Sequence, residues 1–237
     1  METRLYIAVT SREMASPGDF LSGLAGLPVG IKVGLEIFVG HGPGLLKKIV
    51  SAGFPLFLDL KFHDIPFTVA GAVRAACRYS PSIINVHASG GVEMMREAAG
   101  AVDGGTRVLA VTVLTSLGTE DLAEVGLAGN PGDMVPRMAK AAMDAGLDGV
   151  VCSPMEAAAV RRVTDPGFCV VTPGIRPLGS GMDDQRRVST PGRAIEAGAT
   201  ALVVGRPVTM AENPRLAVMS ILDEIDEALK TRRSSAR

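Results

Sequence analysis

Four charged side chains stand within or directly after apolar stretches of the sequence: Lys32, Asp59, Lys61 and Asp64. Asp59 and Lys61 are two residues apart, and residues at that spacing on a β-strand point to the same side. Because charged residues are seldom fully buried without a partner, two lysines and two aspartates at strand ends predict an alternating ion-pair network. Such a network is either a catalytic site or a stabilising cluster at the rim of the fold, since perturbed charges concentrate at functional sites only statistically.

Two loops that contain glycine and arginine form a second candidate site. One apolar stretch ends in Thr172-Pro173-Gly174-Ile175-Arg176 and continues into a loop that reaches Asp184-Gln185-Arg186, and a later stretch ends in Val204-Gly205-Arg206-Pro207. Glycine lets a backbone N–H approach an anion closely, and the arginine guanidinium offers two parallel donors. Together the two loops predict a phosphate site.

Eight short β-branched runs alternate with segments of helical spacing. The expected strands are Leu5–Val9, Gly30–Val33, Leu56–Leu60, Ile83–Val86, Val108–Val113, Gly149–Cys152, Cys169–Thr172 and Ala201–Val204, and the expected helices include Pro43–Ala52, Val69–Tyr79, Val92–Ala101, Met134–Ala145, Pro154–Val163, Gly192–Ala197 and Pro214–Leu229. The strands are continuously apolar, as in a parallel sheet covered on both faces. The pattern predicts an α/β protein with a single (β/α)8 TIM barrel over residues 1–230 and a disordered tail over residues 231–237. The charged motif then ends the third strand, and the glycine–arginine loops follow the seventh and eighth, where barrels commonly bind phosphate.

The overall composition excludes several other classes of protein. Twenty-four basic and twenty-five acidic side chains give a net charge of −1, which offers no basis for binding nucleic acid or a membrane surface. No apolar run reaches the roughly 20 residues needed to cross a bilayer, and the start lacks the pattern of a secretory signal. The three cysteines are odd in number and far apart, which favours free thiols in a cytoplasmic protein.

The sequence contains no motif for a metal or an organic cofactor. It has no P-loop, dinucleotide fingerprint, CxxC pair or HExxH motif. His87 follows the fourth strand but has no carboxylate or second histidine beside it at metal-ligand spacing. His63 lies inside the charged motif, where it either orients the motif or packs its loop. We therefore expect neither a metal nor a cofactor.

The run Phe57-Leu58-Asp59-Leu60-Lys61-Phe62-His63-Asp64-Ile65-Pro66 closely resembles the signature of the orotidine 5′-phosphate decarboxylases. Further matches occur in order along nearly the whole chain, at residues 31–36, 85–88, 111–116, 173–177 and 204–207. The Asp-x-Lys-x-x-Asp core alone is shared with sugar-phosphate decarboxylases and lyases of the same barrel group, whereas the longer motif is much more specific. The resemblance implies that orotidine 5′-monophosphate is decarboxylated to uridine 5′-monophosphate without a cofactor, the last step of UMP biosynthesis.

The resemblance also implies roles for individual residues. Lys61 would protonate C6 of the pyrimidine as carbon dioxide leaves, Asp59 would lie against the substrate carboxylate, and Lys32 would hold Asp59 and reach the ribose. Asp64 and Thr68 would enter the active site of a neighbouring subunit, which predicts a homodimer with shared sites. The other expected substrate contacts are Thr115 at the base, Gln185, Gly205 and Arg206 at the phosphate, and Arg176 in the loop after the seventh strand, with a lid at Gly179–Gly181.

Two positions depart from the family pattern. The first strand ends in Ala8-Val9-Thr10-Ser11, where the family carries an aspartate that binds ribose hydroxyls, so Thr10 can form a hydrogen bond but brings no charge. Phe67 stands where the family has asparagine.

Two other functions stay open. One is a sugar-phosphate decarboxylase or lyase, which would need a metal ligand beside the motif; the other is a weakly active paralogue that binds a nucleotide as a sensor, for which Thr10 is the support.

Overall fold

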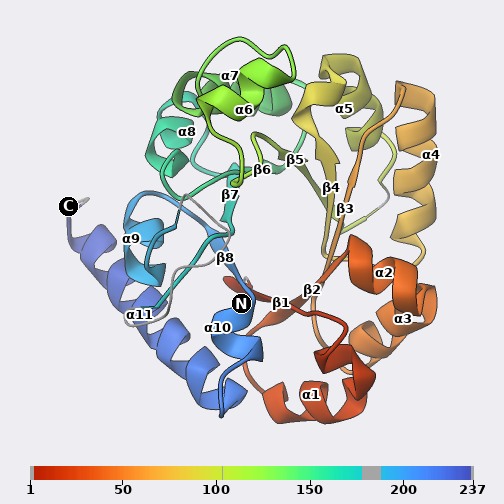
Figure 1. The fold of residues 1–237 in the computed structure, drawn as a ribbon, viewed down its shortest axis with the longest axis vertical. Coiled ribbons are helices and arrows are strands. Elements are labelled where there is room, and N and C mark those ends of the chain that lie inside the picture. The colour runs from red at the N-terminus through yellow and green to blue at the C-terminus, as the bar shows by residue number, and fades with distance from the viewer. Residues whose placement is uncertain (1–2, 103, 178–187, 236–237) are drawn as a thin grey trace.

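The computed structural model describes residues 3–102, 104–177 and 188–235, in which parallel strands close into a barrel (Figure 1). The strands are β1 (Leu5–Ala8), β2 (Gly30–Gly34), β3 (Leu56–Phe62), β4 (Ile83–His87), β5 (Arg107–Val111), β6 (Gly149–Val151), β7 (Cys169–Thr172) and β8 (Ala201–Val204). Each strand pairs with the next, and β1 closes the barrel against β8 through the pairs Leu5↔Leu202 and Ile7↔Val204. The predicted (β/α)8 barrel is confirmed.

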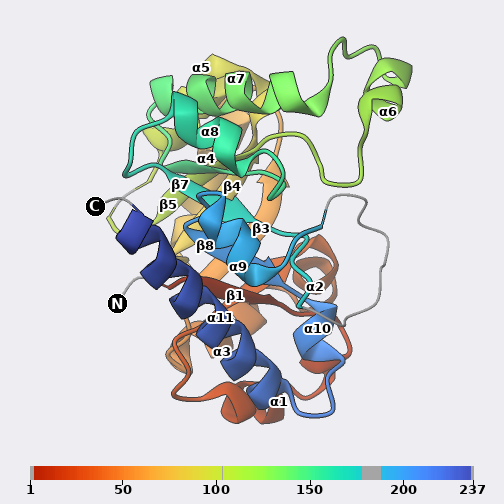
Figure 2. The ribbon, with the colours of Figure 1, turned by 90° about the vertical axis from the view of Figure 1, so that its left-hand side faces the viewer.

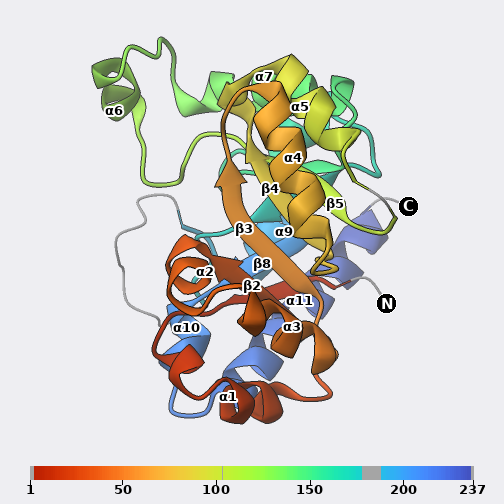
Figure 3. The same ribbon diagram turned by 90° about the vertical axis from the view of Figure 1, so that its right-hand side faces the viewer.

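Helices fill the connections and surround the barrel (Figure 1). They are α1 (Pro17–Leu24), α2 (Leu35–His41), α3 (Pro43–Ser51), α4 (Pro66–Cys77), α5 (Val92–Ala99), α6 (Thr119–Glu124), α7 (Pro131–Asp144), α8 (Ala157–Val163), α9 (Pro191–Glu196), α10 (Arg206–Thr209) and α11 (Pro214–Ser235), with the 3-10 turns η1 (Glu13–Ala15) and η2 (Ala88–Gly90). Figures 2 and 3 agree that α2, α6 and α10, which follow β2, β5 and β8, lie on the side of the barrel away from both chain termini. This side is the mouth of the barrel.

Several helices are present that the sequence pattern did not predict, namely α1, α2, α6 and α10. They are short, and a few residues give too little apolar periodicity to be recognised. The helix expected from Met134 begins earlier, at Pro131, because the Asn130 side chain accepts a hydrogen bond from the Asp133 N–H at 3.0 Å. Proline fits the first helical position, where its missing N–H would have no intrahelical partner.

The end of the chain differs from the expected disordered tail, because α11 continues to Ser235 and residues 231–235 are helical. The Thr231 and Ser234 hydroxyls donate to carbonyl oxygens one turn earlier, and the Arg232 guanidinium lies 3.4 Å from the Ile195 carbonyl oxygen at the end of α9. Extending an existing helix needs no new nucleus, so polar residues can continue it where an isolated segment would stay unfolded.

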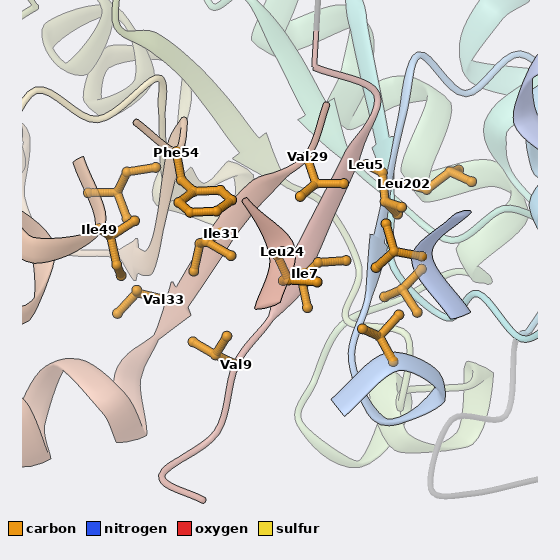
Figure 4. Close-up of a cluster of buried hydrophobic side chains, with 14 of the residues drawn as sticks. Leu5, Ile7, Val9, Leu24, Val29, Ile31, Val33, Ile49, Phe54 and Leu202 are labelled. Carbon is orange, nitrogen blue, oxygen red and sulfur yellow. The ribbon is translucent and has the colours of Figure 1, made fainter. Parts of the chain in front are cut away.

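The apolar core has two layers, one inside the barrel and one between the strands and the helices. Tyr6, Phe57 and Leu109 belong to the inner layer, whereas their neighbours along the strands pack under the helices. Figure 4 shows part of the outer layer, where alternate residues of β1 and β2 meet Leu24 and Ile49 of α1 and α3. Burial on both faces explains the continuously apolar strands. Within the described ranges, no helix combines the length and the apolarity that crossing a bilayer requires.

Candidate active site

The carboxylate of Asp59 is the centre of a charge network at the mouth of the barrel. Its Oδ2 accepts a hydrogen bond from Lys32 Nζ at 2.6 Å, and its Oδ1 accepts from Lys61 Nζ and Asn85 Nδ2, both at 2.7 Å. Burial by itself would raise the pKa of Asp59, which is 7% exposed, but the positive charges of Lys32 and Lys61 and their hydrogen bonds outweigh burial and hold this pKa well below the usual carboxyl range. Asp59 is therefore ionised at physiological pH.

The backbone at the end of β3 is irregular. Lys61 has a φ of +51°, in the left-handed region that residues other than glycine rarely adopt, and the pairing of β3 with β4 shifts register between Leu58 and Phe62. The predicted convergence of Asp59 and Lys61 is confirmed, but it arises at this irregularity and not on a regular strand. Strained backbone that the surrounding structure holds in place is typical of functional sites.

Asn85 of β4 is a member of the network that the sequence reasoning missed. It is completely buried, its Nδ2 donates to Asp59, and its Oδ1 accepts from the Lys61 N–H at 2.8 Å. One amide group thus fixes both the carboxylate and the strained backbone beside it. The available signal was a polar residue inside the apolar strand Ile83–His87, because a buried polar side chain needs hydrogen-bond partners.

A cavity of about 510 Å³ opens at the mouth of the barrel beside this network. The predicted site residues that line it are Thr10, Lys32, Asp59, Lys61, Thr115, Arg176, Gly205 and Arg206. Apolar residues complete the wall, among them Val111, Val113, Leu114, Val151 and Pro173. The volume lies within the range of small-ligand sites, and a largely apolar wall with a few charged groups is usual for such sites.

Two of the described site residues that the sequence predicted do not line this cavity. Asp64 and Thr68 are exposed at the beginning of α4, where an Asp64 carboxylate oxygen accepts from the Ile65 N–H at 2.6 Å. The apolar side chains of Ile65 and Phe67, which accompany them, are 66% and 81% exposed. Gln185, like the lid expected at residues 179–181, lies outside the described residues. Within one chain, Asp64 and Thr68 are therefore apart from the cavity that holds Lys61.

Arg176 and Arg206 enter the cavity from the ends of two neighbouring strands, β7 and β8. The Arg176 N–H donates to the Ser189 carbonyl at 2.9 Å, and the Ser189 N–H donates to the Gly174 carbonyl at 3.1 Å. These two bonds fasten the loop after β7 to the segment that precedes α9. Two guanidinium groups on one rim, with Gly205 beside them, provide the charge and the donors that a phosphate group binds.

The end of β1 carries a negative charge that the sequence reasoning overlooked. Thr10 lines the cavity, and both its N–H and its Oγ1 donate to one carboxylate oxygen of Glu13, at 2.7 and 2.6 Å. Next to Thr10, the Ser11 hydroxyl donates to Glu36 Oε1 at 2.5 Å, and Glu36 also lines the cavity. Thr10 itself brings no charge, as expected, but the Glu13 carboxylate lies one hydrogen bond behind it.

His63 and His87 stack on each other near the network, with ring centroids 5.4 Å apart and ring planes inclined by 28°. Burial, followed by the charges of His63 and Lys61, lowers the pKa of His87, and the opposing effect of Asp59 is smaller. His87 is therefore neutral at physiological pH. The stacking supports a packing role for His63.

In the three described stretches of the chain, no group of three or more His, Cys, Asp or Glu side chains is placed to hold a metal ion.

A closed parallel barrel with an ionised carboxylate between two ammonium groups at its mouth defines the class of the protein, a TIM-barrel enzyme. The family model described as "Orotidine 5′-phosphate decarboxylase / HUMPS family" matches residues 4–221. The chain belongs to this family.

Individual relatives agree with the family match. The chain is 47% identical over 229 residues to a protein of Nitrosomonas europaea named orotidine 5′-phosphate decarboxylase, covering 96% of this chain and 99% of the relative. A protein of Chromohalobacter salexigens with the same name is 51% identical over 200 residues, covering 83% and 85% of the two chains. The crystal structure of orotidine 5′-phosphate decarboxylase from Lactobacillus acidophilus superimposes with a TM-score of 0.82 at 34% identity, covering 94% of this chain and 99% of that chain.

Proposed function

We propose that this chain decarboxylates orotidine 5′-monophosphate to uridine 5′-monophosphate without a cofactor, the last step of UMP biosynthesis. The observation that carries the proposal is the Lys32–Asp59–Lys61 network on the wall of a cavity of about 510 Å³. The names of the relatives at 47% and 51% identity support the same reaction.

The charge network suits the chemistry of this decarboxylation. The bond between C6 of the pyrimidine and its carboxylate breaks, the electron pair stays on C6, and a proton must arrive there. Ionised Asp59 beside the substrate carboxylate would repel it and favour its loss, and Lys61, hydrogen-bonded to Asp59, would supply the proton. A cation that is already in place where negative charge develops stabilises the transition state more than the ground state. Lys32 would fix Asp59 and contact the ribose.

The remaining cavity residues fit the other parts of the nucleotide. Gly205, Arg206 and Arg176 would bind the phosphate, together with Gln185, and Thr115 would contact the base beside the apolar wall. Binding energy from a phosphate remote from C6 can be used to close the site and orient the reacting group. This division of the cavity is supported by the position of the arginines after β7 and β8, the strands whose loops commonly bind phosphate in barrels.

We also propose a homodimer in which each active site receives residues from both subunits. Asp64 and Thr68 are exposed and lie outside the cavity of their own chain, although they belong to the same motif as Lys61. Ile65 and Phe67, exposed by 66% and 81%, supply apolar surface at the same place. An isologous contact through this surface would bring Asp64 and Thr68 of one subunit to the cavity of the other.

A decarboxylation assay tests the proposed function. Purified protein is mixed with orotidine 5′-monophosphate in the presence of a chelator, and the loss of orotidylate absorbance is followed. Steady turnover is the expected result. Turnover only after a divalent metal is restored would point to a metal-dependent lyase of the same barrel group, and nucleotide binding without turnover would point to a sensor. Either outcome would overturn the proposal.

The proposed partner is therefore a small phosphorylated nucleotide and a second copy of the chain, with no nucleic acid and no membrane. Cys77, Cys152 and Cys169 form no disulfide bond, which suits the reducing conditions of the cytoplasm, where we propose that the enzyme acts.

A further inference from the structure

The hydrogen bonds at the end of β1 fix the direction of the Thr10 hydroxyl. A threonine hydroxyl has one proton to donate and two lone pairs, whereas a carboxylate only accepts. Because the Thr10 Oγ1 donates to Glu13 at 2.6 Å, its proton points away from any ligand and its lone pairs remain for one. The N–H of Thr10 donates to the same Glu13 oxygen at 2.7 Å, which holds the carboxylate in place.

Thr10 is positioned next to the charged network. The Val9 N–H donates to the Lys32 carbonyl oxygen at 3.2 Å, so the end of β1 lies beside the end of β2, and Thr10 and Lys32 both line the cavity. Glu13, half-buried in the turn η1, does not line the cavity, and its hydrogen bonds to Thr10 connect it to the cavity wall. A hydroxyl that donates to a carboxylate is polarised, and its oxygen becomes a stronger acceptor.

We infer that Glu13 is a positioning residue that makes Thr10 an acceptor for a sugar hydroxyl of the nucleotide. This inference rests on the proposed function for the identity of the ligand. A ribose hydroxyl is a donor and can bond to the lone pairs of Thr10, whereas a phosphate oxygen is an acceptor and finds no proton there. Thr10 and Glu13 together therefore select a ribonucleotide over a nucleotide that lacks this hydroxyl. They also favour binding of the ribose at the end of β1, with the phosphate bound by Arg176 and Arg206.

The alternative is that Glu13 only stabilises the turn, and the two roles lead to different expected results. The sequence Thr10-Ser11-Arg12-Glu13 has the spacing of a capping box, in which the glutamate accepts from the backbone N–H three residues earlier. In a capping box, however, the threonine hydroxyl accepts a bond from the glutamate N–H, whereas here it donates to the glutamate carboxylate. A cap affects stability. A polarised acceptor affects discrimination between ligands that differ by one hydroxyl.

The test compares inhibition constants for uridine 5′-monophosphate and its 2′-deoxy and 3′-deoxy counterparts, together with kcat and KM for orotidine 5′-monophosphate. The variants are Glu13→Gln, which keeps the size and an acceptor for the Thr10 N–H, Thr10→Val, and the double substitution. Asp19→Asn, which removes an exposed carboxylate from the same β1–β2 connection, is the matched control for loss of charge.

We expect the wild-type protein to prefer the ribonucleotide over at least one deoxy counterpart. Glu13→Gln should reduce that preference about 5- to 10-fold, since a hydrogen bond to a neutral group is weaker than one to a charged group. It should act on KM more than on kcat, and it should have no further effect in the Thr10→Val background. Asp19→Asn should leave the preference unchanged.

The inference is overturned if Glu13→Gln weakens binding of all three nucleotides equally, if its effect persists in the Thr10→Val background, or if only the melting temperature changes. The same holds if the wild-type protein turns over orotidine 5′-monophosphate but binds the three nucleotides equally well. Absence of wild-type turnover would instead overturn the proposed function, and a preference for the ribonucleotide that depends on Glu13 would then still support the inference for nucleotide binding.

Discussion

The two ends of the barrel both contain polar side chains, but they use them differently. At the base, Tyr6 bonds to Ser82 at 3.3 Å, Ser82 donates to the Leu56 carbonyl at 2.8 Å, and Thr200 donates to the Val170 carbonyl at 3.1 Å around a cavity of about 210 Å³. The bonds of these uncharged hydroxyls go to one another or to backbone carbonyl oxygens.

At the mouth, three ionised groups converge on the wall of a cavity of about 510 Å³, and one of them sits on strained backbone. A strained backbone costs stability, and proteins tend to retain such strain at functional sites. This contrast fits the usual division of roles in barrel enzymes, in which the base contributes stability and the mouth carries the chemistry.

Removal of the proposed proton donor at the mouth of the barrel should have the largest effect on activity. Lys61→Ala should leave the fold intact and lower kcat by at least roughly 10³-fold, because both the proton and the preplaced cation are lost. Lys140→Ala, which removes an exposed lysine paired with Asp144 on α7, is the matched control and should keep full activity. Circular dichroism and steady-state kinetics provide the measurements. A kcat within a few-fold of wild type would end the assignment of Lys61.

Mixed dimers test whether the mouth is completed by a second subunit. Lys61→Ala and Asp64→Ala proteins should each be inactive, and mixing them with verified subunit exchange should restore activity. A heterodimer then has one intact site and one doubly damaged site, so equal mixing should restore about a quarter of the wild-type activity if dimers form at random. No recovery would show that Asp64 acts within its own chain or not at all.

Asp59→Asn should reveal how much the ion pairs at the mouth contribute to stability. The folded-state pKa of Asp59 is lowered from its usual 3.8, so its contribution is fully present above that pH and is lost as the pH falls below it. We expect the variant to lose about 2–3 kcal/mol of its free energy of unfolding at neutral pH, less than for a fully buried pair because both lysines reach solvent. In acid, the difference in free energy of unfolding between the wild type and the variant should be smaller. Urea unfolding of the two proteins at pH 7 and at pH 3 measures this difference. An equal difference in stability at the two pH values would contradict the prediction.

Arg206→Ala should weaken the phosphate end of the cavity. KM for orotidine 5′-monophosphate should rise roughly 10- to 100-fold, as expected for a charge-assisted hydrogen bond, with little change for the phosphate-free nucleoside. Arg162→Ala, which changes an exposed arginine on α8, is the matched control. Equal losses for nucleotide and nucleoside would place the phosphate elsewhere.

Tyr6→Phe changes the base of the barrel and should have the smallest effect on stability and activity. Loss of the hydroxyl that bonds to Ser82 should cost about 1 kcal/mol of stability, and kcat/KM should not change. The pKa of Tyr6 is raised by burial, so the side chain is neutral in the whole assay range and no pH dependence is expected from it. A change in kcat/KM without a change in stability would mean that the base takes part in function.

Patterns along the chain were enough to predict the class of fold and most of the residues at the mouth. Eight continuously apolar runs predicted the barrel because parallel strands are buried on both faces, a property that local composition records. Charges that interrupt such runs, as Lys32 and Asp59 do, need partners when they are buried. Eight of the predicted site residues line one cavity in the structure: Thr10, Lys32, Asp59, Lys61, Thr115, Arg176, Gly205 and Arg206.

The way in which these residues meet depends on contacts between distant parts of the chain. Asn85 reaches Asp59 and Lys61 because β4 pairs with β3, and its side chain accepts a hydrogen bond from the left-handed backbone of Lys61. Glu13 reaches Thr10 because a 3-10 turn follows β1, which no periodic pattern announces. Asp64 belongs to the same charged motif as Asp59 and Lys61 by sequence but lies outside the cavity of its own chain. Side-chain direction at irregular backbone depends on contacts between distant segments, so spacing along the chain could not determine it.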